Sequence, residues 1–189
     1  MSAPARLTMS FDRYIEWEKQ QERKHELVDG VITLMAGGTA AHNAISVNLI
    51  IALGARLRGK ACRPFGSDMK VRIPQGNVRY PDVTVDCGKP KPSDLWAAEP
   101  RVIIEVLSPS TEWFDQTQKL EEYQSIPSVM HVAFLSQNRP FGRVWTRAGS
   151  AWTSVDADGA GAALAFSAIE TDLPLSEAYD GVEFAPLEG

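Results

Sequence analysis

The chain has 189 residues, of which 44% are hydrophobic and 23% charged, values that are ordinary for one soluble globular domain. Its net charge of −5 argues against a protein that coats nucleic acid non-specifically, because such binding relies on many lysine and arginine contacts to phosphates. The first twenty residues contain no apolar signal-peptide core and no apolar run reaches 18 residues, so we predict a single cytoplasmic domain over residues 1–189 that neither enters nor crosses a membrane.

The N-terminal part predicts a helix, a hairpin and a second, longer helix. Apolar residues with helical spacing follow a serine or threonine that can cap, which indicates a short helix over residues 9–21. An Asp-Gly pair then separates two β-prone runs, and a two-residue turn there would set Glu26 opposite Thr33. Over residues 40–58 leucine and isoleucine recur every four positions, which predicts a heavily buried helix.

The central part predicts three strands and a helix. Residues 62–73 and 79–87 indicate two strands on either side of a Pro-Gln-Gly-Asn turn, and valines alternate with polar residues in the second. An apolar run that is interrupted by one acid predicts a buried strand over residues 101–107. A helix over residues 115–125 should follow it and end before an Ile-Pro pair.

The C-terminal part predicts mostly strands. A buried strand is expected over residues 130–135 and a hairpin over residues 142–155. Residues 156–161 read as a flexible loop, followed by a final strand over residues 165–169 and a short helix. This order of elements predicts an α/β domain with a central mixed β-sheet flanked by helices.

Basic residues are concentrated between Ala55 and Tyr80, where seven of them accompany the single acid Asp68. They are Arg56, Arg58, Lys60, Arg63, Lys70, Arg72 and Arg79. This segment could face phosphates. The alternative is a solvated helix end followed by an edge strand that is rich in lysine and arginine.

The cysteines and histidines form no recognisable metal-binding pattern. Cys62 and Cys87 lack a C-x-x-C arrangement, and the three histidines are widely spaced, so a zinc site is not expected. In a reducing compartment two free thiols are favoured over a disulfide.

One acid stands inside the predicted buried strand. Glu105 is flanked by apolar residues in RVIIEVL, where an ionised carboxylate is costly unless it is paired, hydrogen-bonded or bound to a metal. Asp82 begins the preceding predicted strand, and adjacent strands could bring both carboxylates to one face. Two hard oxygen donors suit Mg²⁺ or Mn²⁺, which would lower the pKa of a bound water and polarise a phosphoryl oxygen.

A lysine on the following helix could complete such a site. Asp115, Lys119 and Tyr123 recur at four-residue intervals and therefore line one helix face. If that face packs beside the Glu105 strand, the ammonium could orient an attacking water. The alternative is a simple acid-before-base pair between Asp115 and Lys119, which would stabilise the helix by about 0.3–0.5 kcal/mol.

Taken in order, these motifs resemble one protein family. HELVDGVI, a long helix led by His42, YPDVTV, VIIEVLSPST and D-x-x-x-K-x-x-x-Y are similar to the Uma-type family of putative restriction endonucleases, within the PD-(D/E)XK nuclease superfamily. The resemblance spans residues 8–135. It implies a restriction-endonuclease-like fold and phosphodiester cleavage that depends on Mg²⁺ or Mn²⁺.

The resemblance also implies roles for particular residues. Asp82 corresponds to the acid of the PD element, Glu105 to the acid of the (D/E)XK element, and Glu26 to a further carboxylate that would complete the metal site. The superfamily lysine usually stands two residues after the second acid, where this chain has Leu107. The family lysine lies on the following helix, which indicates Lys119.

The remaining motif residues have plainer interpretations. Ser108 and Tyr123 are expected to be structural, as a strand-end hydroxyl and a helix-packing aromatic. His42 is expected to cap or pack against its helix, with substrate contact as the less favoured alternative. The five tryptophans are dispersed and form no stacking cluster, so single-strand binding is not indicated.

The leading hypothesis is a metal-dependent endonuclease that hydrolyses phosphodiester bonds in DNA. The alternative is a catalytically silent nuclease-fold module that binds nucleic acid or a protein partner, which the acidic net charge favours. A third reading is a hydrolase of a small phosphorylated molecule. Homodimerisation would pair two sites for cleavage of both strands.

Overall fold

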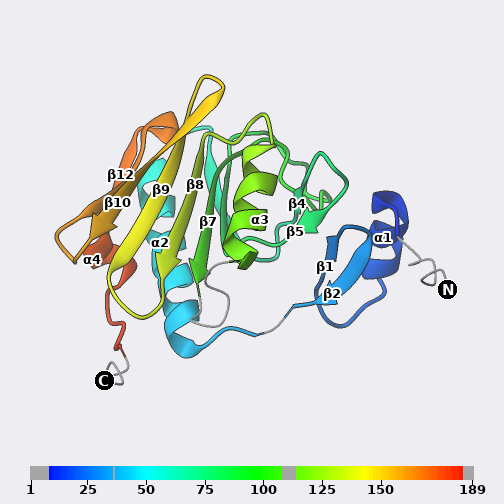
Figure 1. Cartoon of the computed structure of the whole chain (residues 1–189), viewed down its shortest axis with the longest axis horizontal. Coiled ribbons are helices and arrows are strands. Elements are labelled where there is room, and N and C mark those ends of the chain that lie inside the picture. Colours follow the sequence, from blue (N-terminus) through cyan, green and yellow to red (C-terminus); the bar gives the residue numbers. More distant parts are fainter. Residues whose placement is uncertain (1–8, 36, 108–113, 185–189) are drawn as a thin grey trace.

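A six-stranded mixed sheet forms the centre of this computed structural model, which describes residues 9–35, 37–107 and 114–184 (Figure 1). The strand order is β10-β9-β8-β7-β6-β3. β7 and β8 run parallel, and the other neighbours pair antiparallel. The six strands are β3 (Arg63–Gly66), β6 (Val83–Asp86), β7 (Pro100–Leu107), β8 (His131–Ser136), β9 (Phe141–Ala148) and β10 (Ala151–Asp158).

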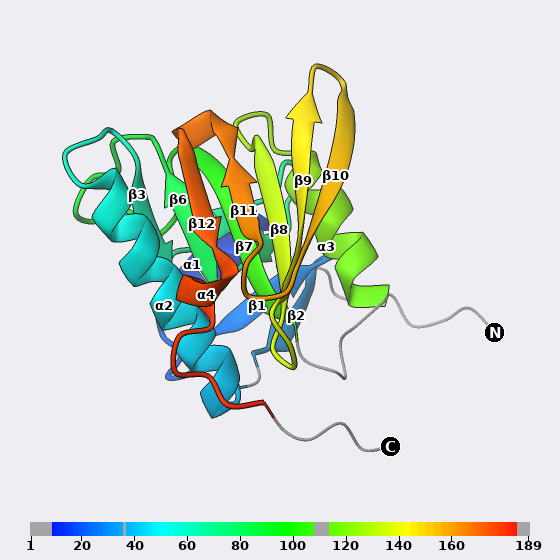
Figure 2. The same ribbon diagram turned by 90° about the vertical axis from the view of Figure 1, so that its left-hand side faces the viewer.

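One face of this sheet is covered by α2 (Ala40–Leu57) together with a C-terminal hairpin and helix (Figure 2). Ile45, Leu49 and Leu53 recur every four residues on α2 and are fully buried, as their spacing predicts. The hairpin and the helix that follows it are β11 (Ala163–Phe166), β12 (Thr171–Pro174) and α4 (Leu175–Ala178). By length and composition α2 could also cross a membrane, but this is weak support for a span because the core helix of a soluble domain passes the same test.

The opposite face of the sheet is covered by α3 (Phe114–Gln124), which connects the parallel strands β7 and β8 (Figures 1 and 2). Alternate residues of β7 point to opposite faces, so Ile104 packs in the α2 cluster and Ile103 packs in the α3 cluster. Glu105 shares the α3 face with Ile103. Apolar residues therefore occur on both faces of the strand, because both faces are buried.

A second, four-stranded sheet has the order β2-β1-β5-β4 and packs against α1 (Phe11–Glu18). Its strands are β1 (His25–Val28), β2 (Val31–Leu34), β4 (Val71–Arg72) and β5 (Val78–Arg79). The predicted hairpin register is confirmed, since Glu26 pairs with Thr33. Both turn residues, Asp29 and Gly30, have positive φ values of 50° and 75°, which is why an Asp-Gly pair occupies this turn.

Two predicted strands are each divided between the two sheets, which corrects the sequence-based boundaries. Residues 62–73 form β3 and β4, separated by a turn in which the Met69 N–H bonds the Gly66 carbonyl. Residues 79–87 form the end of β5 and then β6, because Pro81 has no N–H to contribute to a ladder. Asp82 therefore stands directly before β6.

The C-terminal elements also differ in detail from the prediction. Residues 156–158 extend β10 rather than forming a flexible loop, because they continue the ladder with β9. The predicted final strand over residues 165–169 is instead β11, which is followed by a 3₁₀ turn (Ser167–Ile169) and then by a further strand, β12.

The basic segment does not form one phosphate-binding face. Arg56 pairs with Glu177, and Lys70 forms an ion pair with Glu18 in which both side chains are buried. Arg79 is also buried and paired. The remaining basic residues include three exposed side chains at the end of α2 and on the edge strand β3, as the alternative interpretation expected: Arg58, Lys60 and Arg63.

The two cysteines form a disulfide, which corrects the expectation of free thiols. β3 and β6 pair antiparallel with Arg63 opposite Asp86, so the next residues outward, Cys62 and Cys87, lie opposite each other. The spacing of the cysteines along the chain does not reveal this register, which is why sequence reasoning missed the bond.

Reducing this disulfide should lower the free energy of unfolding by about 3 kcal/mol, because the bond closes a loop of some 25 residues in the unfolded chain. A loss of that size corresponds to a fall in Tm of about 6–12 °C. Thermal unfolding of the wild type with and without a reductant, beside the double variant Cys62→Ser, Cys87→Ser, measures it. An unchanged Tm on reduction would contradict the expectation.

Stability should also depend on His131, which is 1% exposed and accepts a hydrogen bond at Nε2 from the Ala168 N–H at 3.0 Å. Burial lowers its pKa from 6.5 to about 4. Between pH 6.5 and pH 4 the unfolded chain binds a proton at this histidine that the folded chain does not bind. The free energy of unfolding is therefore highest above about pH 6.5 and falls by up to about 3 kcal/mol as the pH approaches 4. Urea unfolding across this range should show a flatter pH profile for His131→Gln; parallel profiles would exclude His131 as the cause.

Candidate active site

Asp82 and Glu105 lie side by side where β6 and β7 pair. Val83 is opposite Ile104, so the antiparallel register continued by one residue sets Asp82 opposite Glu105. The Val106 N–H donates to Asp82 Oδ2 at 2.7 Å, which ties Asp82 to the residue after Glu105. The structure thus brings together the two acids that the sequence placed on neighbouring strands.

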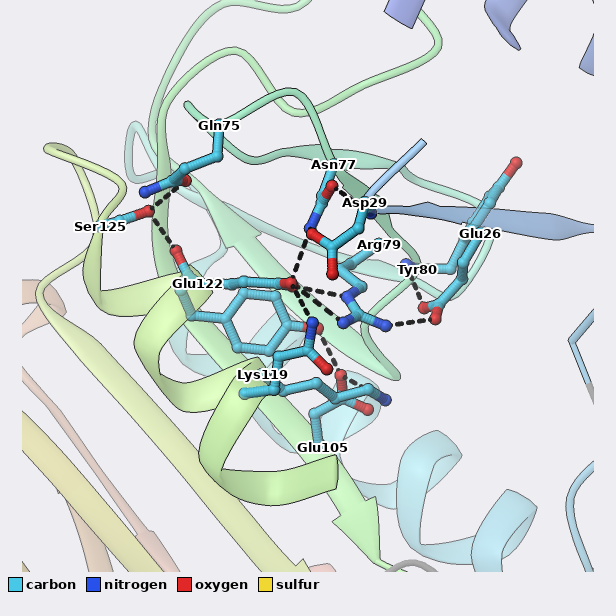
Figure 3. A network of polar contacts seen from close by, with 12 residues as sticks. Glu26, Asp29, Gln75, Asn77, Arg79, Tyr80, Glu105, Lys119, Glu122 and Ser125 are labelled. Carbon is cyan, nitrogen blue, oxygen red and sulfur yellow. Dashed lines mark hydrogen bonds and ion pairs between the residues drawn. The ribbon is translucent and has the colours of Figure 1, made fainter. Parts of the chain in front are cut away.

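Glu105 is 5% exposed and contacts the predicted helix face of α3 (Figure 3). The Tyr123 hydroxyl donates to Glu105 Oε1 at 2.5 Å, and Lys119 Nζ lies 3.3 Å from the same oxygen. Burial, with a smaller contribution from the charge of Asp82, raises the pKa of Glu105 to about 7 against the lowering effect of Lys119. Tyr123, predicted to be only a packing residue, therefore also orients this carboxylate.

Asp82 has a second contact, which sequence reasoning did not anticipate. His42 Nε2 lies 3.1 Å from Asp82 Oδ2, and this hydrogen bond raises the pKa of the imidazole. His42 lies in the first turn of α2, where its backbone N–H bonds the capping hydroxyl of Thr39 at 3.2 Å. The only signal in the sequence was its position at the start of a long helix.

The two carboxylates are arranged alike. Within the described residues, Asp82 Oδ2 and Glu105 Oε1 each have two donor partners, whereas Asp82 Oδ1 and Glu105 Oε2 accept no hydrogen bond. One oxygen of each acid is therefore held by protein donors, and the other, which has no donor among the described residues, is the one that could accept a ligand. Two adjacent hard oxygen donors of this kind fit Mg²⁺ or Mn²⁺.

Glu26 has other partners in this structure. Its Oε2 lies 2.8 Å from Arg79 Nη1, and its Oε1 accepts the Tyr80 N–H at 3.2 Å. Among the described residues no group of three or more His, Cys, Asp or Glu side chains is placed to hold a metal ion. The predicted three-carboxylate site is therefore not assembled, and metal ligation by Glu26 stays a prediction.

A buried ionic network fixes α3 relative to the second sheet (Figure 3). Arg79 is 3% exposed and bonds Glu122 on α3, with Nε 2.6 Å from Glu122 Oε2, as well as Glu26 on β1. Asn77 donates to Glu122 Oε1 at 2.8 Å and accepts the Asp29 N–H. The network sets the position of the helix that carries Lys119, and no pattern in the sequence indicates these contacts.

A cavity of about 560 Å³ opens beside Asp82 and His42. Its lining includes two basic residues that precede β1, Arg23 and Lys24, and the polar residue Asn43 on α2. This cavity provides a route by which an anionic substrate could reach Asp82.

Two predictions fall outside what the structure describes. Ser108 lies outside the described residues, and the side chain of Asp115 is not described. The helical pair between Asp115 and Lys119 therefore stays a prediction.

The mixed sheet, the two acids at its β6–β7 ladder and the lysine on the next helix define a restriction-endonuclease-like α/β protein. A solved structure shows the same fold: a putative nuclease belonging to DUF820 from Anabaena variabilis superposes with a TM-score of 0.74, over 93% of this chain and 99% of that chain, at 15% identity. The predicted fold class is thereby confirmed.

The Uma2 family, described as putative restriction endonuclease, matches residues 11–176, and the chain belongs to this family. Two relatives come from Synechocystis. The uncharacterized protein slr1290 is 36% identical over 130 residues, covering 68% of each chain. The uncharacterized protein sll1609 is 34% identical over 128 residues, covering 66% of this chain and 72% of its own. The family resemblance seen in the sequence is confirmed, and it places the chain among nuclease-like proteins.

Proposed function

We propose that this protein is an endonuclease that requires Mg²⁺ or Mn²⁺ and hydrolyses phosphodiester bonds in DNA. The observation that carries the proposal is the arrangement of Asp82 and Glu105, which face each other with one oxygen of each held by protein donors. Lys119, in contact with Glu105, supplies a cation at the same place. The family to which the chain belongs supports a nuclease-like activity.

Each group has a defined task in this reaction. Asp82 and Glu105 would hold the divalent ion, which when bound lowers the pKa of a water and offsets charge on the phosphoryl group. Lys119 would orient the attacking water or stabilise the charge that develops on the phosphate. Tyr123 keeps Glu105 Oε1 in place, and Arg23 beside the cavity would contact the substrate backbone.

DNA as substrate, a cytoplasmic location and a homodimer belong to the same proposal. A dimer would present two sites to the two strands of a duplex. A reducing cytoplasm would open the Cys62–Cys87 bond, so activity should be measured both with and without a reductant.

Replacing Glu105 by glutamine should abolish both metal binding and plasmid nicking, because the amide keeps the shape of the side chain but removes its charge. Calorimetric titration with Mn²⁺ and nicking of supercoiled plasmid, made on the same samples, measure the two properties. Glu121→Gln is the matched control, because Glu121 is exposed on α3 and the same charge is lost there. The control should retain both properties.

The thermal stability of the variant provides an independent check that it folds. Burial raises the pKa of Glu105 from 4.5 to about 7, so ionising this carboxyl group destabilises the folded chain. This loss of stability is absent below pH 4.5 and complete above pH 7. Without metal, Glu105→Gln should therefore melt no lower than the wild type at about pH 8. A stable variant that still nicks plasmid would exclude Glu105 from the reaction, and wild-type protein that neither binds Mn²⁺ nor nicks would favour the silent module.

A further inference from the structure

His42 is held in an arrangement that serves its contact with Asp82. Its side chain is 19% exposed, and Nε2 lies 3.1 Å from Asp82 Oδ2. The other ring nitrogen, Nδ1, is buried and has no hydrogen-bond partner among the described residues. Leaving a buried ring nitrogen unpaired is unfavourable, which indicates that the ring is oriented for what Nε2 does.

The direction of this hydrogen bond follows from its partners. An ionised carboxylate can only accept, so Nε2 carries the hydrogen and donates to Asp82 Oδ2. The same oxygen accepts the Val106 N–H at 2.7 Å. Two donors that converge on Oδ2 fix the rotation of the carboxylate and leave Oδ1 for a ligand.

Gly38 packs against the back of the imidazole. A Cβ atom added at Gly38 would lie 2.6 Å from His42 Nδ1 and 3.0 Å from Cγ, so any side chain here would displace the ring. Gly38 is not among the glycines with positive φ, which means that space rather than backbone conformation requires a glycine. Gly37, one residue away, has no atom within 4 Å of an added Cβ.

We infer that His42 is a positioning residue that directs Asp82 Oδ1 toward the divalent cation, and that Gly38 holds the ring in place to do so. The inference rests on the proposed function, because it assumes that Asp82 holds a metal ion. Hydrogen-bond partners of metal-ligating side chains typically change metal affinity by about 10–100-fold when they are removed.

Four variants separate positioning from folding. His42→Leu removes the donor, whereas His42→Gln retains an amide N–H near the position of Nε2. Gly38→Ala displaces the ring without changing its chemistry, and Gly37→Ala is its matched control. Calorimetric titration with Mn²⁺ gives the affinity of each folded variant, and plasmid nicking is followed separately.

The Mn²⁺ affinity of His42→Leu should fall by about 10–100-fold, with a smaller fall in Gly38→Ala. His42→Gln and Gly37→Ala should stay within about 3-fold of the wild type, since one keeps the donor and the other leaves the ring undisturbed. Equal affinities in the wild type and His42→Leu would overturn the inference even if the protein nicks DNA. If the wild type binds Mn²⁺ but does not nick DNA, the Mn²⁺ affinities of the wild type and His42→Leu still decide whether the inference holds. If the wild type binds no Mn²⁺, both this inference and the metal-dependent function are overturned.

Discussion

Arg79→Met should lower the free energy of unfolding by about 3–5 kcal/mol, the largest loss we expect from a single substitution in this chain. Arg79 is 3% exposed and bonds two carboxylates, those of Glu26 and Glu122. Methionine retains most of the aliphatic volume but removes the cation. The buried Glu122 and the partly buried Glu26 would then lack a cation, and an uncompensated buried charge costs more than the pair itself contributes.

Urea unfolding of the two proteins tests this expectation. Arg143→Met is the control, because Arg143 pairs with Asp156 in an exposed ion pair that should contribute less than about 1 kcal/mol. Adding Glu122→Gln to Arg79→Met should restore part of the lost stability, since it removes one of the unpaired charges. Similar losses in Arg79→Met and Arg143→Met would show that burial of the network has little energetic importance.

Local features of the fold could be predicted because they depend on neighbouring residues. The Asp29-Gly30 turn fixed the register of the first hairpin, so Glu26 was correctly placed opposite Thr33. The four-residue spacing of Lys119 and Tyr123 correctly indicated one helix face, which contacts Glu105. In each case a short segment carries the information.

Features that depend on how distant segments meet could not be predicted. Asp82 follows Pro81 where the chain passes from β5 in one sheet to β6 in the other, and the disulfide depends on the register between β3 and β6. The contact between His42 and Asp82 joins residues 40 positions apart, through a helix end whose direction no local pattern gives. Candidate acids can therefore be identified from sequence, whereas the groups that hold them in position require the structure.

Plasmid nicking by Lys119→Met should fall by about 10²–10³-fold, the usual effect of removing one group that stabilises charge in a transition state. Lys119 Nζ lies 3.3 Å from Glu105 Oε1, so it is placed to act beside the two carboxylates that we propose as metal ligands. Because the ammonium and a divalent ion repel each other, its removal should leave the affinity for Mn²⁺ unchanged or increase it. Calorimetry at about pH 8 is suitable, since Glu105 would otherwise bind a proton more readily without its cationic neighbour.

The contrast with Glu105→Gln makes this prediction specific. Loss of a metal ligand and loss of a group that acts on the water or phosphate both lower nicking strongly, but only loss of the ligand abolishes Mn²⁺ binding. Lys119→Arg keeps the positive charge beside Glu105 and should bind Mn²⁺ like the wild type, while the different geometry of its guanidinium leaves nicking reduced. If Lys119→Met lost Mn²⁺ binding together with nicking, the lysine would be acting through the position of Glu105, and another cation would have to serve the reaction. If it retained full nicking, the helix face that carries Lys119 would serve only to stabilise Glu105 in the fold.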